Sequence, residues 1–140
     1  MKKLLLTLAL AVAGLLGSIF PSAAQNKGVV LAAIPKSIGG EFWETVERGA
    51  RRAAKDLNIN LKWEGTVTET EIAEPNKIIE NMVNLGVKGI ALAPLNQKAM
   101  RKQVENAVAA GIPVVIFDSG VDGNAQSSFV ATDNKNGGVI

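Results

Sequence analysis

The side chains best suited to chemistry fall in two short segments, one near position 40 and one near position 118. The first carries Lys36 and the adjacent aromatics Phe42 and Trp43, and the second places Asp118 and Ser119 directly after an apolar run. A carboxylate can accept two hydrogen bonds from neighbouring hydroxyls, and a lysine adds a rotatable donor. An aromatic ring can cover the apolar C–H face of a sugar. These residue types therefore suit a sugar or a related small polar solute.

Each candidate also has a structural interpretation. Phe42 lies on the apolar stripe of its predicted helix, so a core role and a site role are equally open. Trp43 lies one residue off that stripe, which favours the site, although a partly exposed structural tryptophan would give the same pattern. Asp118 at a strand end could be a plain turn residue, and Trp63 is better explained by packing. The convergence of the candidates on one sheet edge favours the site.

Strand-like and helix-like segments alternate along the chain. We expect strands at residues 28–34, 59–63, 88–93, 113–117 and 128–132. Helices should begin near Glu41, at Thr70 or Glu74, and after Asn96 as N-cap. Strands that alternate with helices imply crossover connections and a parallel sheet. The predicted fold is an α/β lobe with a doubly wound parallel sheet, in which ligands bind at the carboxyl ends of the strands.

The apolar residues of the predicted helices recur at helical spacing, so each helix should turn a stripe toward the sheet. The first stripe is Phe42, Val46, Ala50, Ala53, Ala54 and Leu57. The second is Ile78, Ile79, Met82, Val83 and Leu85, and the third is Met100, Val104, Ala107 and Val108. We expect these side chains to form the core together with the strands.

Residues 1–24 have the features of a secretory signal peptide. Lys2 and Lys3 precede the apolar run Leu4–Leu16, and the small residues Ser22-Ala23-Ala24 follow it. A retained membrane anchor is the weaker alternative, so we expect cleavage after Ala24 and export to the periplasm. Removing the two lysines leaves 13 of the 15 basic residues against 13 acidic ones. The basic excess therefore gives no support for a nucleic-acid partner.

Composition excludes several classes of enzyme. The chain has no cysteine and no histidine, so it contains no thiol nucleophile, no Ser-His-Asp set and no Cys/His metal site. The first strand–helix turn lacks G-x-G-x-x-G, and no P-loop pattern occurs. Pairs such as Asp118 with Asp122 or Asp133 are a weak sign of acid–base chemistry. We therefore expect a binding protein with no catalytic residue, metal or cofactor, rather than an enzyme.

Four stretches of the sequence resemble one known family. In chain order they read VVLAAIPK followed by GGEFW, NLGVKGI followed by APLN, GIPVVIFDS, and VATDN followed by GG. Their order and content are similar to the periplasmic sugar-binding proteins of the ribose-binding type, the substrate-binding components of ABC transporters with the type I fold. The resemblance covers residues 27–140.

The resemblance implies a two-lobed protein about twice this length, with the solute trapped between lobes that close by hinge motion. Residues 25–132 then form the N-terminal lobe and residues 133–140 begin the crossover, so we expect a fragment that lacks the second lobe. The family's contacts carry over to Phe42, Trp43 and Asp118. Because Lys36 and Ser119 depart from the ribose-binding pattern, the implied ligand is a sugar or a sugar-like solute rather than ribose.

Two functions fit these expectations. The leading one is a periplasmic monomer that captures a sugar or polyol for the membrane subunits of an ABC transporter. The alternative is the ligand-binding module of a chemotaxis or sensor-kinase receptor system. A sugar-responsive repressor would need a helix-turn-helix where this chain has an export signal. A hydrolase or transferase on a similar sheet would be distinguished by turnover.

Overall fold

The computed structural model describes residues 28–70 and 73–139, so the expected signal peptide at residues 1–24 lies outside the described residues. Every predicted strand and helix is present, in the predicted order, and each strand is shorter than expected, the third at both ends and the others at one. The elements are β1 (Val30–Ile34), α1 (Glu41–Asp56), β2 (Asn60–Trp63), α2 (Glu74–Leu85), β3 (Ile90–Leu92), α3 (Gln97–Ala109), β4 (Val114–Phe117), β5 (Ser128–Val130) and α4 (Asn134–Gly137).

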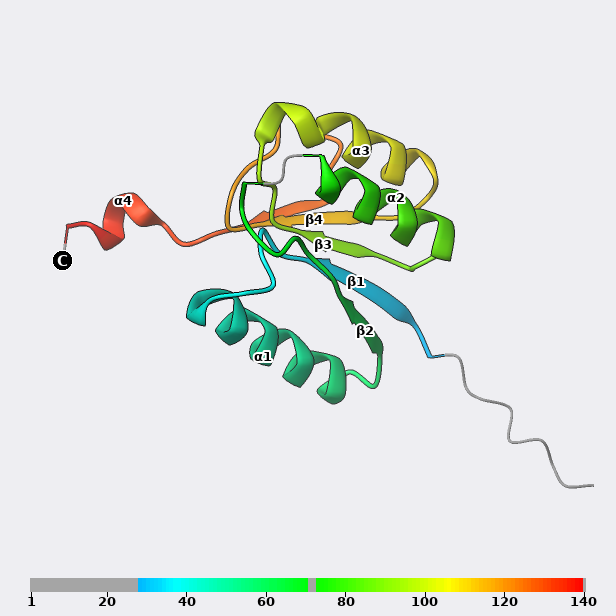
Figure 1. The fold of residues 1–140 in the computed structure, drawn as a ribbon, viewed down its shortest axis with the longest axis horizontal. Helices are drawn as coiled ribbons and strands as arrows, with labels where there is room; N and C mark the ends of the chain where they lie inside the picture. Colours follow the sequence, from blue (N-terminus) through cyan, green and yellow to red (C-terminus); the bar gives the residue numbers. More distant parts are fainter. Residues whose placement is uncertain (1–27, 71–72, 140) are drawn as a thin grey trace, which may run out of the picture.

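The strands form one five-stranded parallel sheet in the order β2-β1-β3-β4-β5. Val30 of β1 pairs with Asn60 of β2, and Ala32 pairs with Ile90 of β3. Helix α1 covers one face of the sheet, while α2 and α3 lie side by side on the other (Figure 1). The predicted doubly wound α/β sheet is confirmed. Because the strands run the same way, the segments that follow them leave the sheet at one common edge.

The core lies between the sheet and helices α2 and α3. Alternate strand residues point to this face, and Ile90 and Leu92 of β3 are buried there with Val114 and Ile116 of β4. The helices contribute the buried side chains Ile78, Ile79, Met82, Met100, Val104 and Ala107. Most of the predicted second and third stripes are therefore confirmed as core.

The opposite face of the sheet is covered in part. Helix α1 packs on the side of β2, while Val115 and Phe117 of β4 stay half-buried and Val130 of β5 is 61% exposed. An apolar groove of about 410 Å³ follows α1 along β1 and β3. A second groove of about 270 Å³ lies between α1 and the side of β4 and β5. We call the face under α2 and α3 the closed face and this one the open face.

Four residues predicted to face the sheet do not pack against it. Phe42 is 60% exposed, Leu57 is 68% exposed and Leu85 is 58% exposed. Each lies in the first turn, at the last residue or just past the end of its helix. Ala53, in the last turn of α1, is also exposed, and like Leu57 it lines the groove on the open face. For these positions the stripe prediction is wrong.

The ends of the helices follow from local sequence. The Asn96 side chain accepts hydrogen bonds from the backbone N–H groups of Lys98 and Ala99 at 3.0 and 2.9 Å, which confirms it as the N-cap of α3. Gly86 ends α2 with φ of +72°, a left-handed conformation that glycine adopts without strain. Helix α2 begins at Glu74, the later of its two predicted starts, with Pro75 in its first turn.

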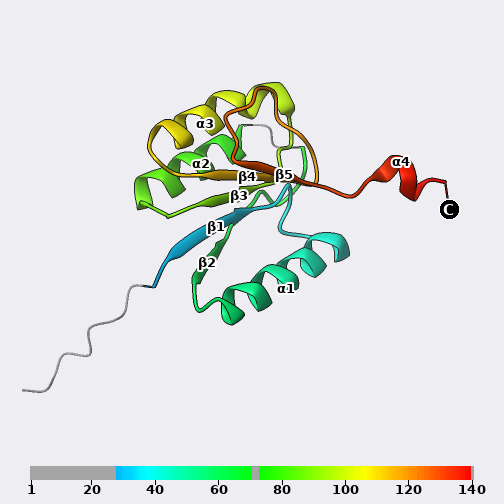
Figure 2. The same ribbon diagram turned by 180° about the vertical axis from the view of Figure 1, so that it is seen from behind.

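The chain leaves the sheet after β5 and extends away from it. Residues 131–139 are exposed, and the short helix α4 stands apart from the other elements (Figure 2). Asp133 precedes α4 as its N-cap, and its side chain accepts a hydrogen bond from the Asn136 N–H. Among the residues described, no helix combines the length and the apolar character needed to span a bilayer.

Candidate functional site

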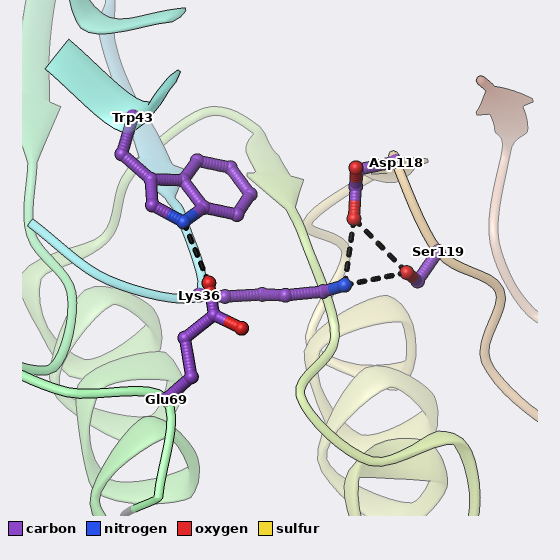
Figure 3. A network of polar contacts seen from close by, with 5 residues as sticks. All are labelled: Lys36, Trp43, Glu69, Asp118 and Ser119. Atoms are coloured by element: carbon purple, nitrogen blue, oxygen red, sulfur yellow. Dashed lines mark hydrogen bonds and ion pairs between the residues drawn. The ribbon is translucent and has the colours of Figure 1, made fainter. Parts of the chain in front are cut away.

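The turns that follow β1 and β4 meet at the carboxyl edge of the sheet. Lys36 Nζ lies 2.7 Å from Asp118 Oδ2 and donates a hydrogen bond of 2.6 Å to Ser119 Oγ (Figure 3). Ser119 Oγ in turn donates to Asp118 Oδ2 at 2.9 Å. Three of the predicted site residues thus form one group, which we call the polar cluster.

The polar cluster favours an ionised Asp118. Partial burial works to raise the pKa of the Asp118 carboxyl, but hydrogen bonds from Lys36 and Ser119 and the charge of Lys36 outweigh it. The pKa therefore lies below its ordinary value, and the group is a carboxylate at neutral pH. Both contacts within the cluster use Oδ2, so Oδ1 remains a second acceptor for a ligand hydroxyl.

A tight turn fixes the position of Asp118. Its φ of +65° lies in the left-handed region, which aspartate and asparagine tolerate better than most residues. The Ser119 N–H donates to the Phe117 carbonyl at 2.8 Å, which closes a γ-turn around Asp118. The Asp118 N–H donates to the Val130 carbonyl at 3.0 Å and ties the turn to β5. Strain of order 1–3 kcal/mol is characteristic of such positions and concentrates at functional sites.

The two aromatics at the start of α1 have opposite environments. Phe42 is 60% exposed, whereas Trp43 is buried with 6% exposure. Their ring centroids are 4.9 Å apart with planes at 84°, and Trp43 also meets Phe117 edge to face at 6.3 Å. The expectation from helical spacing was that Trp43 would be the more exposed ring. It is buried instead, because it packs beyond the sheet edge against Phe117, and Phe42 is the ring available to a ligand.

A hollow of about 450 Å³ lies beside the exposed ring and the turn after β4. Of the predicted site residues, Phe42 and Asp118 line it; Lys36, Trp43 and Ser119 do not. The full lining is Phe42, Phe117, Asp118, Val130, Ala131, Thr132 and Asn134. The grooves of the open face offer apolar walls and no comparable cluster of hydrogen-bonding groups. The hollow at the carboxyl edge is therefore the candidate site.

The loop between β2 and α2 also contributes to the site, which the sequence did not predict. The Trp43 Nε1–H donates to Glu69 Oε1 at 2.8 Å (Figure 3). Thr66 of the same loop is 1% exposed and its hydroxyl lies 2.6 Å from the Lys36 carbonyl oxygen. A buried indole N–H needs an acceptor. The signal that could have pointed to Glu69 was therefore a carboxylate in a neighbouring loop at the same edge of the sheet. The site therefore draws on three loops rather than two.

The chemistry of the site is that of hydrogen bonding. The polar cluster combines one carboxylate, one ammonium and one hydroxyl, a set that matches a polyhydroxylated solute. Within residues 28–70 and 73–139, no three acidic side chains gather closely enough to hold a metal ion.

The chain is similar to known proteins. A family model described as a periplasmic binding protein domain matches residues 31–140. The D-ribose/D-allose-binding protein of Pseudomonas aeruginosa is 32% identical over 115 residues, which cover 76% of this chain and 36% of that protein. The chain spans between 36% and 46% of the length of the curated relatives it matches.

Two crystal structures share the fold. A carbohydrate transporter solute-binding protein from Agrobacterium radiobacter, in complex with D-arabinose, has a TM-score of 0.75 and 35% identity, covering 79% of this chain and 37% of that one. An ABC transporter solute-binding protein from Agrobacterium vitis, with bound D-fucose, has a TM-score of 0.73 and 36% identity, covering 78% of this chain and 39% of that one. The chain belongs to the periplasmic binding protein family.

Proposed function

We propose that this chain is the first lobe of a periplasmic protein that binds a sugar or related polyol and delivers it to the membrane subunits of an ABC transporter. The observation that carries the proposal is the polar cluster beside the exposed Phe42 ring, at the carboxyl edge of a parallel sheet. Relatives whose names or bound ligands refer to ribose, allose, arabinose and fucose support a sugar as the solute.

Binding follows from the chemistry of the cluster. Asp118 Oδ1 accepts a hydrogen bond from a sugar hydroxyl without displacing Lys36 from Oδ2, and a carboxylate strengthens that bond. Lys36 donates to Asp118 and Ser119, which leaves one of its three ammonium hydrogens for the same sugar. Phe42 covers the apolar face of the ring. The hollow of about 450 Å³ falls within the usual range of small-ligand sites, about 300–1,000 Å³.

A second lobe completes the proposed site. Small-ligand sites usually enclose most of the ligand surface, whereas the candidate hollow is bordered by the exposed residues Val130, Ala131 and Thr132. The proposed second lobe would follow the crossover at residues 133–140 and close over the solute by hinge motion. The proposed signal peptide at residues 1–24 directs the protein to the periplasm, where it acts as a monomer and carries out no reaction.

The test is calorimetric titration of the full-length protein with D-ribose, D-allose, D-arabinose and D-fucose. We expect at least one of these sugars to bind. Asp118→Asn should weaken that binding by about tenfold or more, because a hydrogen bond to a charged group contributes about 1.5–3 kcal/mol. Asparagine suits the positive φ at this position, so the variant tests the charge rather than the turn.

Asp122→Asn is the matched control. Asp122 lies in the same segment and is half-buried, but it does not line the hollow, so its substitution should leave the affinity within about twofold. A folded wild-type protein that binds none of the four sugars would contradict the proposed function. Binding that is equally tight in Asp118→Asn would instead refute the assigned site.

A further inference from the structure

The loop between β2 and α2 is fastened to the turn that follows β1. The Ile38 N–H donates to the Thr66 carbonyl at 2.8 Å, and Ser37 Oγ donates to the Val67 carbonyl at 3.1 Å. The Thr66 hydroxyl is 2.6 Å from the Lys36 carbonyl, and Ser37 and Thr66 are both buried. Buried polar groups with satisfied hydrogen bonds hold a specific geometry. The two segments therefore behave as one unit.

The same two segments touch at a glycine. A Cβ added at Gly65 would lie 2.9 Å from Pro35 Cγ and 3.0 Å from the Pro35 carbonyl oxygen. Real Cβ atoms essentially never show the first distance, and the second is tighter than nine in ten real Cβ contacts, so any other residue would force the loop or the turn to shift. The close approach places the rest of the loop beside the first turn of α1.

The loop brings Glu69 to the buried indole. Glu69 Oε1 accepts the Trp43 Nε1–H at 2.8 Å, and a carboxylate acceptor makes this a charge-assisted bond. Glu69 is itself exposed, so its position depends on the fastened loop rather than on burial. The indole is thus held at its nitrogen by Glu69 and at its ring by Phe117 at 6.3 Å.

The indole in turn contacts the ring that faces the candidate hollow. Phe42 stands edge to face on Trp43 with centroids 4.9 Å apart, and 60% of Phe42 is exposed. Edge-to-face aromatic pairs have a preferred geometry worth about 0.5–1.5 kcal/mol beyond burial. A rotation of the indole would therefore move the preferred position of the Phe42 ring.

We propose that Glu69 is a positioning residue of the sugar site: it orients Trp43, and Trp43 sets the Phe42 ring against the solute. The inference rests on the proposed function, because it assigns Glu69 a part in the same binding site. Glu69 adds to affinity through the two aromatics and without touching the sugar.

Three variants of the full-length protein separate this role from a general effect on the loop. Glu69→Leu removes the acceptor, while Glu69→Gln keeps an amide oxygen that can accept the same N–H. Glu64→Leu removes an exposed carboxylate at the start of the same loop, for which the described part of the chain shows no side-chain hydrogen bond. Each is titrated with the member of the four-sugar panel that binds the wild type most tightly.

Nuclear magnetic resonance reports directly on the indole. Each tryptophan of the full-length protein gives one indole N–H signal in the ¹⁵N–¹H spectrum, and Trp43→Phe identifies the one from Trp43. Loss of a charge-assisted hydrogen bond moves an N–H signal, so the Trp43 signal should shift in Glu69→Leu and stay in place in Glu64→Leu. A role confined to loop stability would not single out this signal.

We expect Glu69→Leu to weaken sugar binding by about tenfold, Glu69→Gln by about threefold or less, and Glu64→Leu not at all. Wild-type affinity in Glu69→Leu would overturn the proposal, as would an unmoved Trp43 signal or an equal loss in Glu64→Leu. If Glu69→Leu fails to fold, Glu69→Gln decides instead. A tenfold loss of affinity in Glu69→Gln, relative to a wild type that binds the sugar, would then overturn the proposal. A wild type that binds none of the sugars refutes the proposed function, and the indole signal still decides whether Glu69 holds Trp43.

Discussion

The two faces of the sheet are built from the same strands but differ in how well they are covered. On the closed face, Leu92 and Ile116 are fully buried under α2 and α3. On the open face, Val115, the neighbour of Ile116 in β4, is half-buried and lines both grooves beside α1. Residues that are adjacent along one strand thus have different surroundings, because successive side chains point to opposite faces.

This difference indicates where the stability of the lobe originates. Apolar burial contributes about 25 cal/mol per Å² removed from water, and close packing adds further dispersion energy. The closed face collects both contributions from the apolar side chains of the sheet and of helices α2 and α3. The open face collects a smaller share, because its grooves leave apolar walls without neighbours. We therefore expect the closed face to tolerate changes of volume poorly and the open face to tolerate them well.

The largest effect should come from Ile116→Ala. Ile116 is 0% exposed on the closed face, and truncation of a buried isoleucine to alanine costs about 2–5 kcal/mol through lost transfer energy and a residual cavity. Urea unfolding of the full-length protein, followed by circular dichroism, measures the change in the free energy of unfolding of the lobe.

Val115→Ala is the comparison on the open face. Its side chain already borders a groove, so the loss should stay near or below about 1 kcal/mol. Equal losses at positions 115 and 116 would show that both faces are covered in the full-length protein, and would remove the distinction between them.

Adding one carbon should have a medium effect on stability, and the sign of that effect should differ between the faces: a loss on the closed face and a gain on the open face. Val104 of α3 is 2% exposed, and Val104→Ile adds one methylene to this buried side chain; overpacking of this kind costs about 1–3 kcal/mol. Gly49→Ala adds a carbon on α1, where an added Cβ meets nothing within 4 Å. Alanine is favoured over glycine in a helix by about 1 kcal/mol, so this variant should be stabilised.

The measurement is the urea midpoint of each variant against that of the wild type. A lower midpoint for Val104→Ile and a higher one for Gly49→Ala would sharpen the comparison between the faces. A lower midpoint for Gly49→Ala would mean that α1 lies closer to the sheet than the groove of about 270 Å³ indicates.

The contrast between the faces also explains which parts of the fold the sequence could predict. Order, type and parallel pairing follow from alternating periodicities and from caps such as Asn96, and all were confirmed. Burial at the helix ends was not predictable from periodicity, because Phe42 and Leu85 continue the apolar stripe and are nevertheless exposed. Periodicity identifies the inner side of a helix but not the extent of the surface opposite it.

The site was predictable where it depends on topology. Lys36, Asp118 and Ser119 follow strands that end at the same edge, and the structure brings them together. The positive φ of Asp118 and its γ-turn had no signal in the sequence, since the residues around it fit an ordinary turn. Glu69 lies 26 positions from Trp43, and a contact between two loops of that separation depends on tertiary structure. Whether these residues bind a solute stays a prediction.

The smallest expected effect lies at the edge where the two faces meet, and it depends on pH. The pKa of Asp118 is lowered in the folded protein, since hydrogen bonds from Lys36 and Ser119 and the charge of Lys36 outweigh the effect of partial burial. A lowered folded-state pKa contributes stability at pH values above the unfolded-state pKa of about 3.9. That contribution is lost as the pH falls through the folded-state pKa.

Asp118→Asn removes this one contribution and keeps a residue that accepts the positive φ. The difference in urea midpoint between the wild type and Asp118→Asn should therefore be constant above about pH 5 and should shrink as the pH falls below about 4. The effect is small because the Asp118 side chain is 30% exposed and solvent screens its ion pair. Asp122→Asn, measured over the same pH range, is the control. It shows how much of the change in midpoint comes from protonation of any carboxylate rather than from the polar cluster. A difference for Asp118→Asn that stays constant to about pH 2 would mean that the Lys36–Asp118 pair does not favour the folded state, and the edge would then contribute to binding without contributing to stability.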